Sequence, residues 1–191
     1  AATANGMFVT DADPIRRGPY DDAESSHEFL ASPFHRAAAL CGTCHDVSNP
    51  VFVQAGDPAT YVPGDLDAPH PDADLRNMFP IERTYSEWKN SAFASSGVDM
   101  RGRFGGNIAL VSTCQDCHLK DVTGAGSNIA ESPNRTDLGW HDMPGANTCI
   151  PDILPDFDPE VDVAQLQAGK VRAMAMLSLA ATMELTLTPV D

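Results

Sequence analysis

The sequence predicts a mostly irregular chain with several short α-helices and minor β-structure at its termini. Its 191 residues suit a single domain spanning 1–191. The chain holds 14 glycines and 15 prolines, which favours turns and loops. Hydrophobic residues make up 42% of the chain, slightly less than in an average globular domain. We therefore expect the core to be completed by something other than side chains.

Charge and hydropathy narrow the classes of partner. The net charge is −15, and a field of that sign repels a phosphate backbone, so we expect no nucleic acid partner. A partner with a basic patch stays open. We also expect no transmembrane segment, because the longest uncharged run near the C-terminus, Ala173 to Met183, is too short to span a bilayer.

Two cysteine motifs carry the chemistry of this sequence. Four of the five cysteines form two C-x-x-C pairs, and a histidine directly follows each pair. Composition alone would place both histidines there with a probability of roughly 0.001. The two motifs are Cys41-Gly42-Thr43-Cys44-His45 and Cys114-Gln115-Asp116-Cys117-His118.

This spacing is typical of covalent haem c attachment. The two thiols of one motif add across the two vinyl groups of a haem, and the adjacent histidine binds the iron as the proximal axial ligand. The sequence therefore predicts two haem c groups. Their attachment sites are Cys41, Cys44, Cys114 and Cys117, and their proximal iron ligands are His45 and His118.

Three other uses of paired cysteines explain the sequence less well. A zinc ribbon places its second pair about 15–20 residues after the first, whereas Cys44 and Cys114 are 70 positions apart. A thioredoxin-type pair needs a βαβ context, and two disulfides leave the histidines unexplained. Three roles stay open for Cys149, the remaining cysteine: a buried small residue, a free thiol, or one half of a bond to another chain.

Each of the two segments expected to hold a haem contains a signal for the start of a helix. Ser32-Pro33 predicts a helix that leads into the first motif, within a first haem segment spanning 25–50. Thr84 to Glu87 form a capping-box pattern, which predicts a helix within a second haem segment spanning 82–147. We expect loops over 50–80 and 97–112 and irregular structure over 120–159.

A third segment spans 158–191. Asp158-Pro159-Glu160 predicts the start of a helix that continues through Leu177. From Met183 to Thr188 apolar and polar residues alternate, which predicts a strand. The short extended stretch Met7–Val9 is its candidate partner.

The remaining histidines supply more distal ligands than two irons need. We therefore expect bis-His, low-spin iron at both sites. The distal candidates are His141, His35 and His27, with His70 as the weakest because prolines flank it. Methionine is the competing ligand type, from Met78, Met100 or Met143.

His35 lies six residues before Cys41. That is too close for it to fold over the opposite face of its own haem. We expect it to reach the neighbouring haem instead.

The order of the motifs resembles the large multihaem c-type cytochromes of anaerobic respiration and extracellular electron transfer. The resemblance covers about half of the chain, over residues 16–50, 82–118 and 140–147. It rests on Arg17-Gly18-Pro19, Ser32-Pro33-Phe34-His35, Leu40 to Val47, Asn49-Pro50, Thr84-Tyr85-Ser86-Glu87-Trp88, Cys114 to His118, and His141 with Pro144-Gly145-Ala146-Asn147.

The chain also departs from those cytochromes. It has two haem motifs where they usually have more, and residues 98–112 look like an insertion before the second motif. In longer relatives the helix near residues 160–180 leads to a β-rich domain, and we expect no counterpart of that domain here.

The resemblance implies a haem-cored multihaem cytochrome c fold and a function in electron transfer, not catalysis. It assigns distal ligation to His35 and to His141, which precedes the Pro-Gly-Ala-Asn stretch. It also implies a secreted protein in the periplasm or at the cell surface, and the small residues Ala1-Ala2-Thr3 resemble what signal cleavage leaves. The alternative is a dihaem redox enzyme, a peroxidase or small oxyanion reductase, with an open iron site.

The expected partners are other cytochromes or copies of the chain itself. Spare histidines and the orphan C-terminal strand favour an extracellular filament in which haems continue from one copy to the next. The charge of −15 opposes this, and a soluble monomer is the alternative. The acidic clusters are most simply solvated surface; a calcium ion is their alternative use, although no EF-hand spacing is present.

Overall fold

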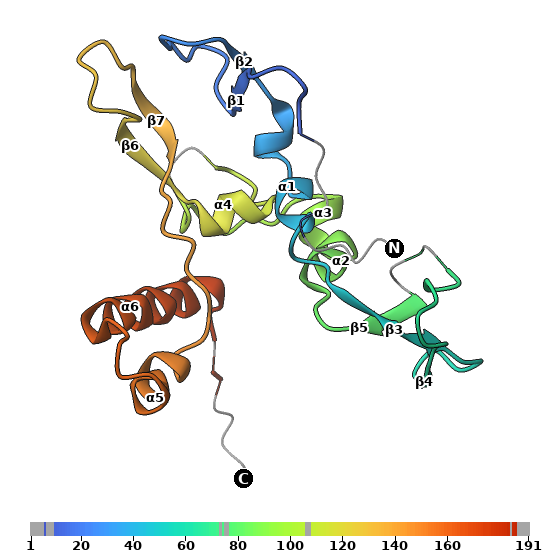
Figure 1. Ribbon diagram of the computed structural model, residues 1–191. Coiled ribbons are helices and arrows are strands. Elements are labelled where there is room, and N and C mark those ends of the chain that lie inside the picture. Colours follow the sequence, from blue (N-terminus) through green and yellow to red (C-terminus); the bar gives the residue numbers. More distant parts are fainter. Residues whose placement is uncertain are drawn as a thin grey trace.

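The computed structural model describes residues 6, 10–72, 74, 77–105, 108–183 and 185–186. Over these residues the chain forms short helices and three small β-sheets. Figure 1 shows the helices that carry the two cysteine motifs near the centre, with the sheets and a C-terminal helix pair extending from them as separate arms. The fold class is therefore a mixture of short helices and small sheets.

The first cysteine motif follows two short helical turns. Residues Pro33–Arg36 form a 3₁₀ helix, η1, with Ser32 at its N-cap and Pro33 in its first turn, as the sequence predicts. The expected continuous helix is wrong, because Ala37 takes an extended conformation, with φ −93° and ψ 140°. A second turn, α1, then spans Ala39–Gly42. Upstream, β1 (Arg16–Gly18) pairs in parallel with β2 (Phe29–Ala31).

The segment expected to be a loop over 50–80 contains an antiparallel sheet. Its strands are β3 (Ser48–Gln54), β4 (Tyr61–Pro63) and β5 (Met78–Pro80), in the order β4-β3-β5. The ring of Phe79 packs on Phe52 and Tyr61, with centroids 5.5 and 5.3 Å away. Pro63 and Pro80 occupy the ends of β4 and β5, where a missing N–H is tolerated.

The expected helix after Thr84 is interrupted. It forms as α2 (Thr84–Lys89) and α3 (Ala92–Ser95). Thr84 is not the cap, because the N-cap is Arg83 and the Thr84 hydroxyl instead donates to Oε1 of Glu82 at 2.8 Å. The described parts of the stretch 97–112, which are 97–105 and 108–112, form a loop, as expected, with an antiparallel bridge between Val98 and Val111.

Helix α2 connects the first motif to the residues before the second. The rings of Tyr85 and Trp88 stack 5.3 Å apart, and the Trp88 indole N–H donates to the Ser112 carbonyl at 2.7 Å. The Tyr85 ring also lies against the backbone of Gly42. Aromatic packing therefore fixes the two motif regions to one another.

The second motif forms α4, Cys114–His118. Thr113 and Asp116 make a reciprocal capping box at its start, which sequence reasoning missed. The region expected to be irregular over 120–159 then contains an antiparallel hairpin and a further helix. These are β6 (Asp121–Ala125), β7 (Asn134–Gly139) and α5 (Ile150–Phe157).

The predicted C-terminal helix is present as α6, Val163–Ala180. Its start differs from the prediction: Asp158 caps the end of α5, and Asp162 is the N-cap of α6, accepting from the Gln165 N–H at 3.1 Å. In the described part of the predicted terminal strand, Met183, Leu185 and Thr186 have no strand structure. The rest of that strand and Met7–Val9 lie outside the described residues.

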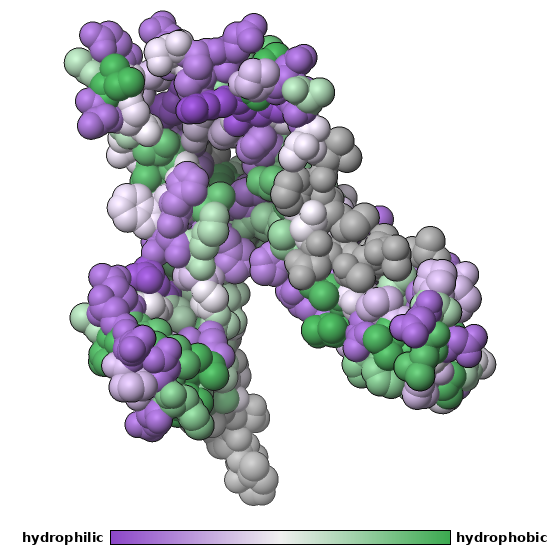
Figure 2. Space-filling model, in the orientation of Figure 1, coloured by the Kyte–Doolittle hydropathy of each residue, from purple (hydrophilic) through white to green (hydrophobic). Residues whose placement is uncertain are grey.

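The core of the protein alone is small. Among the described residues, its main cluster consists of Met100, Phe104 and Val111, with Met176 and Leu179 of α6 packed against it. The accessible surface is 13540 Å², whereas a compact protein of this length exposes about 9,000 Å². Figure 2 shows the arms standing apart on this face. No described helix is long and apolar enough to cross a membrane.

Replacing Gly42 with alanine tests the aromatic clamp. A Cβ at this position would lie 2.7 Å from the Tyr85 ring, so the ring must leave its stack on Trp88. We expect Gly42→Ala to lower the free energy of unfolding by about 1–3 kcal/mol in chemical denaturation. Gly169→Ala is the control, since its Cβ has ordinary space within a helix. Equal stability of the two variants would contradict the clamp.

Candidate functional site

The fold brings the two cysteine motifs into contact. The thiols of Cys41 in α1 and Cys114 in α4 lie within hydrogen-bond distance of one another. The side-chain amide of Gln115 donates to the carbonyls of His35 and Ala37, at 3.1 and 2.8 Å. The second motif is thereby packed against the segment that leads into the first, although the two are about 70 residues apart in sequence.

The four motif thiols have different environments. The hydrogen bond from Cys114 lowers the pKa of the Cys41 thiol to about 6, with a smaller contribution from His45. The same contact raises the pKa of Cys114, since it must supply the proton. Burial, followed by the charge of Asp116, raises the pKa of Cys117 to about 11. The first cysteine of the first motif is therefore the most readily ionised of these three.

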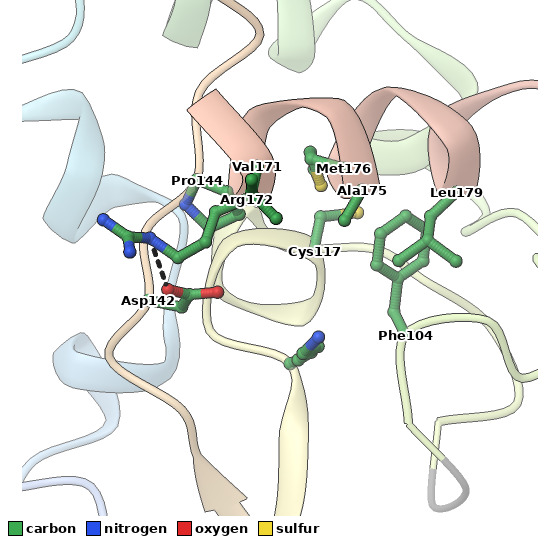
Figure 3. A pocket seen from close by; sticks show the side chains of 10 residues that line it. Phe104, Cys117, Asp142, Pro144, Val171, Arg172, Ala175, Met176 and Leu179 are labelled. Atoms are coloured by element: carbon green, nitrogen blue, oxygen red, sulfur yellow. Dashed lines mark ion pairs between the residues drawn. The ribbon is translucent and has the colours of Figure 1, made fainter. Parts of the chain in front are cut away.

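Cys117 opens onto an apolar hollow beneath α6. The hollow has a volume of about 200 Å³. Figure 3 shows Cys117 facing the same space as Met176, Ala175 and Leu179 of α6, with Phe104 on the other side. Apolar side chains therefore surround one thiol that a haem would use.

An ion pair closes one side of this hollow. Nε of Arg172 lies 2.9 Å from Oδ1 of Asp142, and Figure 3 shows the pair beside Pro144. It joins α6 to the stretch 140–145, which also contacts the second motif. The hollow is thus bounded by residues far apart in sequence.

Both predicted proximal histidines are held at Nδ1. For His45 the partner is Oε1 of Glu82, at 2.9 Å. For His118 the partner is the carbonyl oxygen of Pro144, also at 2.9 Å. An oxygen acceptor at Nδ1 keeps the proton there and leaves the lone pair of Nε2 for a metal. This is the tautomer that iron ligation needs, at both motifs.

Glu82 is held in place to accept from His45. Its oxygen also accepts from the Thr84 hydroxyl at 2.8 Å. The hydrogen bond from His45, and next that from Thr84, lower the pKa of the Glu82 carboxyl, so it is ionised at neutral pH. Sequence reasoning missed Glu82 and Pro144, because neither a carboxylate 37 residues away nor a backbone carbonyl has a motif.

The stretch that carries His141 runs beside the second motif. The Met143 N–H donates to the His118 carbonyl at 3.1 Å, with Met143 at a φ of 40°. His141 itself is exposed. Pro144, the first residue of the Pro-Gly-Ala-Asn stretch, thus lies at Nδ1 of His118.

The backbone of His35 lies beside the second motif. Gln115 of the second motif holds its backbone, and Nδ1 of its ring is buried with no hydrogen-bond partner among the described residues. His27, by contrast, is exposed, and its Nδ1 lies 2.7 Å from the Ser25 hydroxyl.

His70 is better placed for ligation than its flanking prolines suggest. Its Nδ1 bonds the Asp72 carbonyl at 2.6 Å, while Nε2 is buried and has no partner among the described residues. It lines a cavity of about 490 Å³ with the apolar side chains of Val51, Val62 and Leu66. The sequence feature that could have indicated a site beside His70 is the apolar content of the two strands that line the cavity.

The competing ligands are placed less favourably. Met78 and Met100 are buried within packed protein, with 0% and 8% of their surface exposed. Met143 is 64% exposed.

Cys149 is exposed and unbonded, so the buried alternative for it is wrong.

The residues present fit covalently attached haem. Each motif offers two thiols and a histidine in the tautomer required for iron, and apolar surface adjoins one of the thiols. Among the described residues, no three His, Cys, Asp or Glu side chains gather into a metal-ligand set. No family model, curated protein or solved structure matches the chain, so its motifs and geometry carry the functional argument.

Thiol reactivity in the haem-free protein tests the contact between motifs. At pH 7 Cys41 is mostly thiolate and Cys117 is almost wholly protonated. Allowing for the weaker nucleophilicity of a low-pKa thiolate, Cys41 is expected to react with an aromatic disulfide roughly 100-fold faster than Cys117. Mass mapping of the labelled cysteines measures this. In Cys114→Ala, which removes the hydrogen-bond donor, the advantage of Cys41 should shrink; an unchanged rate would show that the contact is absent.

Proposed function

We propose that the chain is a dihaem c-type cytochrome that transfers electrons. The observation that carries this proposal is the placement of two CxxCH motifs against one another, each with its histidine held at Nδ1 by an oxygen acceptor. Haem c, when bound, supplies a one-electron couple at its iron. The order of the motifs, which resembles that of multihaem cytochromes, supports the same function and a periplasmic or extracellular location.

In this proposal the chain's residues anchor and orient both groups. Cys41 and Cys44 anchor one, Cys114 and Cys117 the other, and the contact between Cys41 and Cys114 sets the two attachment points side by side. Close attachment points favour electron transfer between the two sites over a short distance. Glu82 and Pro144 keep the proximal histidines in one tautomer and orientation.

For distal ligation we propose histidine at both sites. His35 is the favoured ligand at the second site, because Gln115 ties its backbone to the second motif. His141 remains a candidate because of the resemblance to multihaem cytochromes. His27 remains one because the chain has more histidines than two irons need. His70 joins them because its Nε2 is buried and unbonded.

Haem content and iron spin state test the proposal. The protein produced in a host that attaches haem c should carry two covalent haems by mass and show low-spin absorption and magnetic-resonance spectra without a methionine-to-iron band. A chain that gains no haem would overturn the proposal. Two haems with a high-spin component would instead favour the redox enzyme with an open iron site.

Single alanine variants identify the distal ligands. His35→Ala should open one iron and leave both haems attached, because attachment needs only the thiols. His27→Ala, His70→Ala and His141→Ala are compared by the same spectra, and one of them should open the other iron. If His35→Ala leaves both irons low-spin with unchanged spectra, its assignment is wrong.

We further propose that copies of the chain associate, so that haems continue from one copy to the next. The observation that favours this is exposed apolar surface on α5, where Ile150, Ile153 and Phe157 share one helix face with 45%, 45% and 81% exposure. The large surface of the isolated chain points the same way.

Sedimentation and negative-stain microscopy at physiological salt test the association. The intact holoprotein should form species larger than a monomer, and Phe157→Ser should weaken them because it removes the most exposed apolar group of α5. Ile129→Ser, which removes a residue 62% exposed in the turn between β6 and β7, is the control. A protein that stays monomeric at high concentration would contradict association.

A further inference from the structure

The two proximal histidines differ in the charge of the group that accepts their Nδ1 proton. His45 donates to a carboxylate, which is a full negative charge, while His118 donates to the neutral carbonyl of Pro144. The two N–O distances are equal, at 2.9 Å. The difference between the sites is therefore one of charge, not of hydrogen-bond length.

An anionic acceptor makes the imidazole a stronger electron donor. As the proton on Nδ1 is drawn toward the carboxylate, negative charge accumulates on the ring and the basicity of Nε2 rises. A more basic axial nitrogen stabilises ferric iron more than ferrous iron, which lowers the reduction potential. A neutral carbonyl does this to a smaller extent, because charge-assisted hydrogen bonds are the stronger ones.

The position of Glu82 is built into the fold. The N–H groups of Ile81 and Glu82 both donate to the carbonyl of Val47, at 3.1 Å, and Val47 is two residues from His45. The Arg83 guanidinium also donates to the Val47 carbonyl, at 3.0 Å. These hydrogen bonds tie the junction between β5 and α2, which carries Glu82, to the chain that leaves the first motif. They thereby hold the Glu82 carboxylate beside His45.

Thr84 moderates the same carboxylate. Its hydroxyl donates to Oε1, the oxygen that accepts from His45. Two donors on one oxygen share its negative charge, so the Thr84 hydrogen bond weakens the pull of Glu82 on the His45 proton. Removing the Thr84 hydroxyl and removing the Glu82 charge should therefore act in opposite directions.

We propose that Glu82 is a positioning residue that sets the first haem site at a lower reduction potential than the second, so that electrons pass from the first site to the second. The inference rests on the proposed dihaem function. It goes beyond that function by assigning a direction to transfer within the chain and a residue that sets it.

The test is spectroelectrochemical titration of the holoprotein and three variants. The unaltered protein should show two separate midpoint potentials. Glu82→Gln keeps an oxygen acceptor but removes the charge, and it should raise the lower midpoint toward the upper one while leaving the upper one in place. Thr84→Val should move that same lower midpoint further down.

Glu87→Gln is the matched control. Glu87 is exposed on α2, so its loss removes one negative charge near the first motif without touching His45. It should leave the gap between the midpoints unchanged. Opposite responses to the Glu82 and Thr84 variants would not arise from general loosening of the structure, which would shift both in one direction.

Three results would overturn the inference. These are a single midpoint in the unaltered protein, a Glu82→Gln shift that moves both midpoints equally, and no shift at all. Haem content by mass is measured first on the same samples. Two attached haems with unresponsive midpoints would overturn only the role of Glu82, whereas absence of haem would overturn the dihaem function as well.

Discussion

The contact between the two cysteine motifs is the constraint on which the rest of the structure depends. Helices α1 and α4 span four and five residues, and helices that short do not persist in water by themselves. They are held by the thiol contact between Cys41 and Cys114, by Gln115 on the backbone of η1, and by the stacked rings of α2. Long-range side-chain contacts therefore stabilise α1 and α4, because helix propensity alone is not sufficient for helices of this length.

The proposed attachment of haem at the two motifs would also account for the small core. Large flat prosthetic groups at the centre would supply the apolar contacts that the arms lack, and α6 already presents Met176 and Leu179 toward Cys117. A group that attaches to the folded chain stabilises it by mass action or by covalent constraint. In the proposed dihaem protein these groups would cover part of the 13540 Å² surface.

Sequence patterns predicted the motifs, the start of η1 and helix α6, because each depends on neighbouring residues. They missed the β3–β5 sheet, whose strands are held by ring packing of Phe52, Tyr61 and Phe79 across 27 residues. They also missed the polar hairpin β6–β7, which Tyr20 anchors through its hydroxyl to the Asp137 carbonyl at 2.9 Å. The motifs predict His45 and His118 as proximal ligands but not the acceptors at their Nδ1 atoms, because tertiary structure alone brings these acceptors to the histidines.

The charge of the chain acts on the two sites in two different ways. The net charge of −15 comes largely from exposed carboxylates, whose effect on a distant group is screened beyond about 8 Å at physiological salt. Carboxylates farther than this from both motifs shift the two sites by similar, small amounts. Glu82 lies 2.9 Å from His45, well inside the screening length, and it touches one site only. A single carboxylate in contact with one ligand can therefore act on the potential of that site alone.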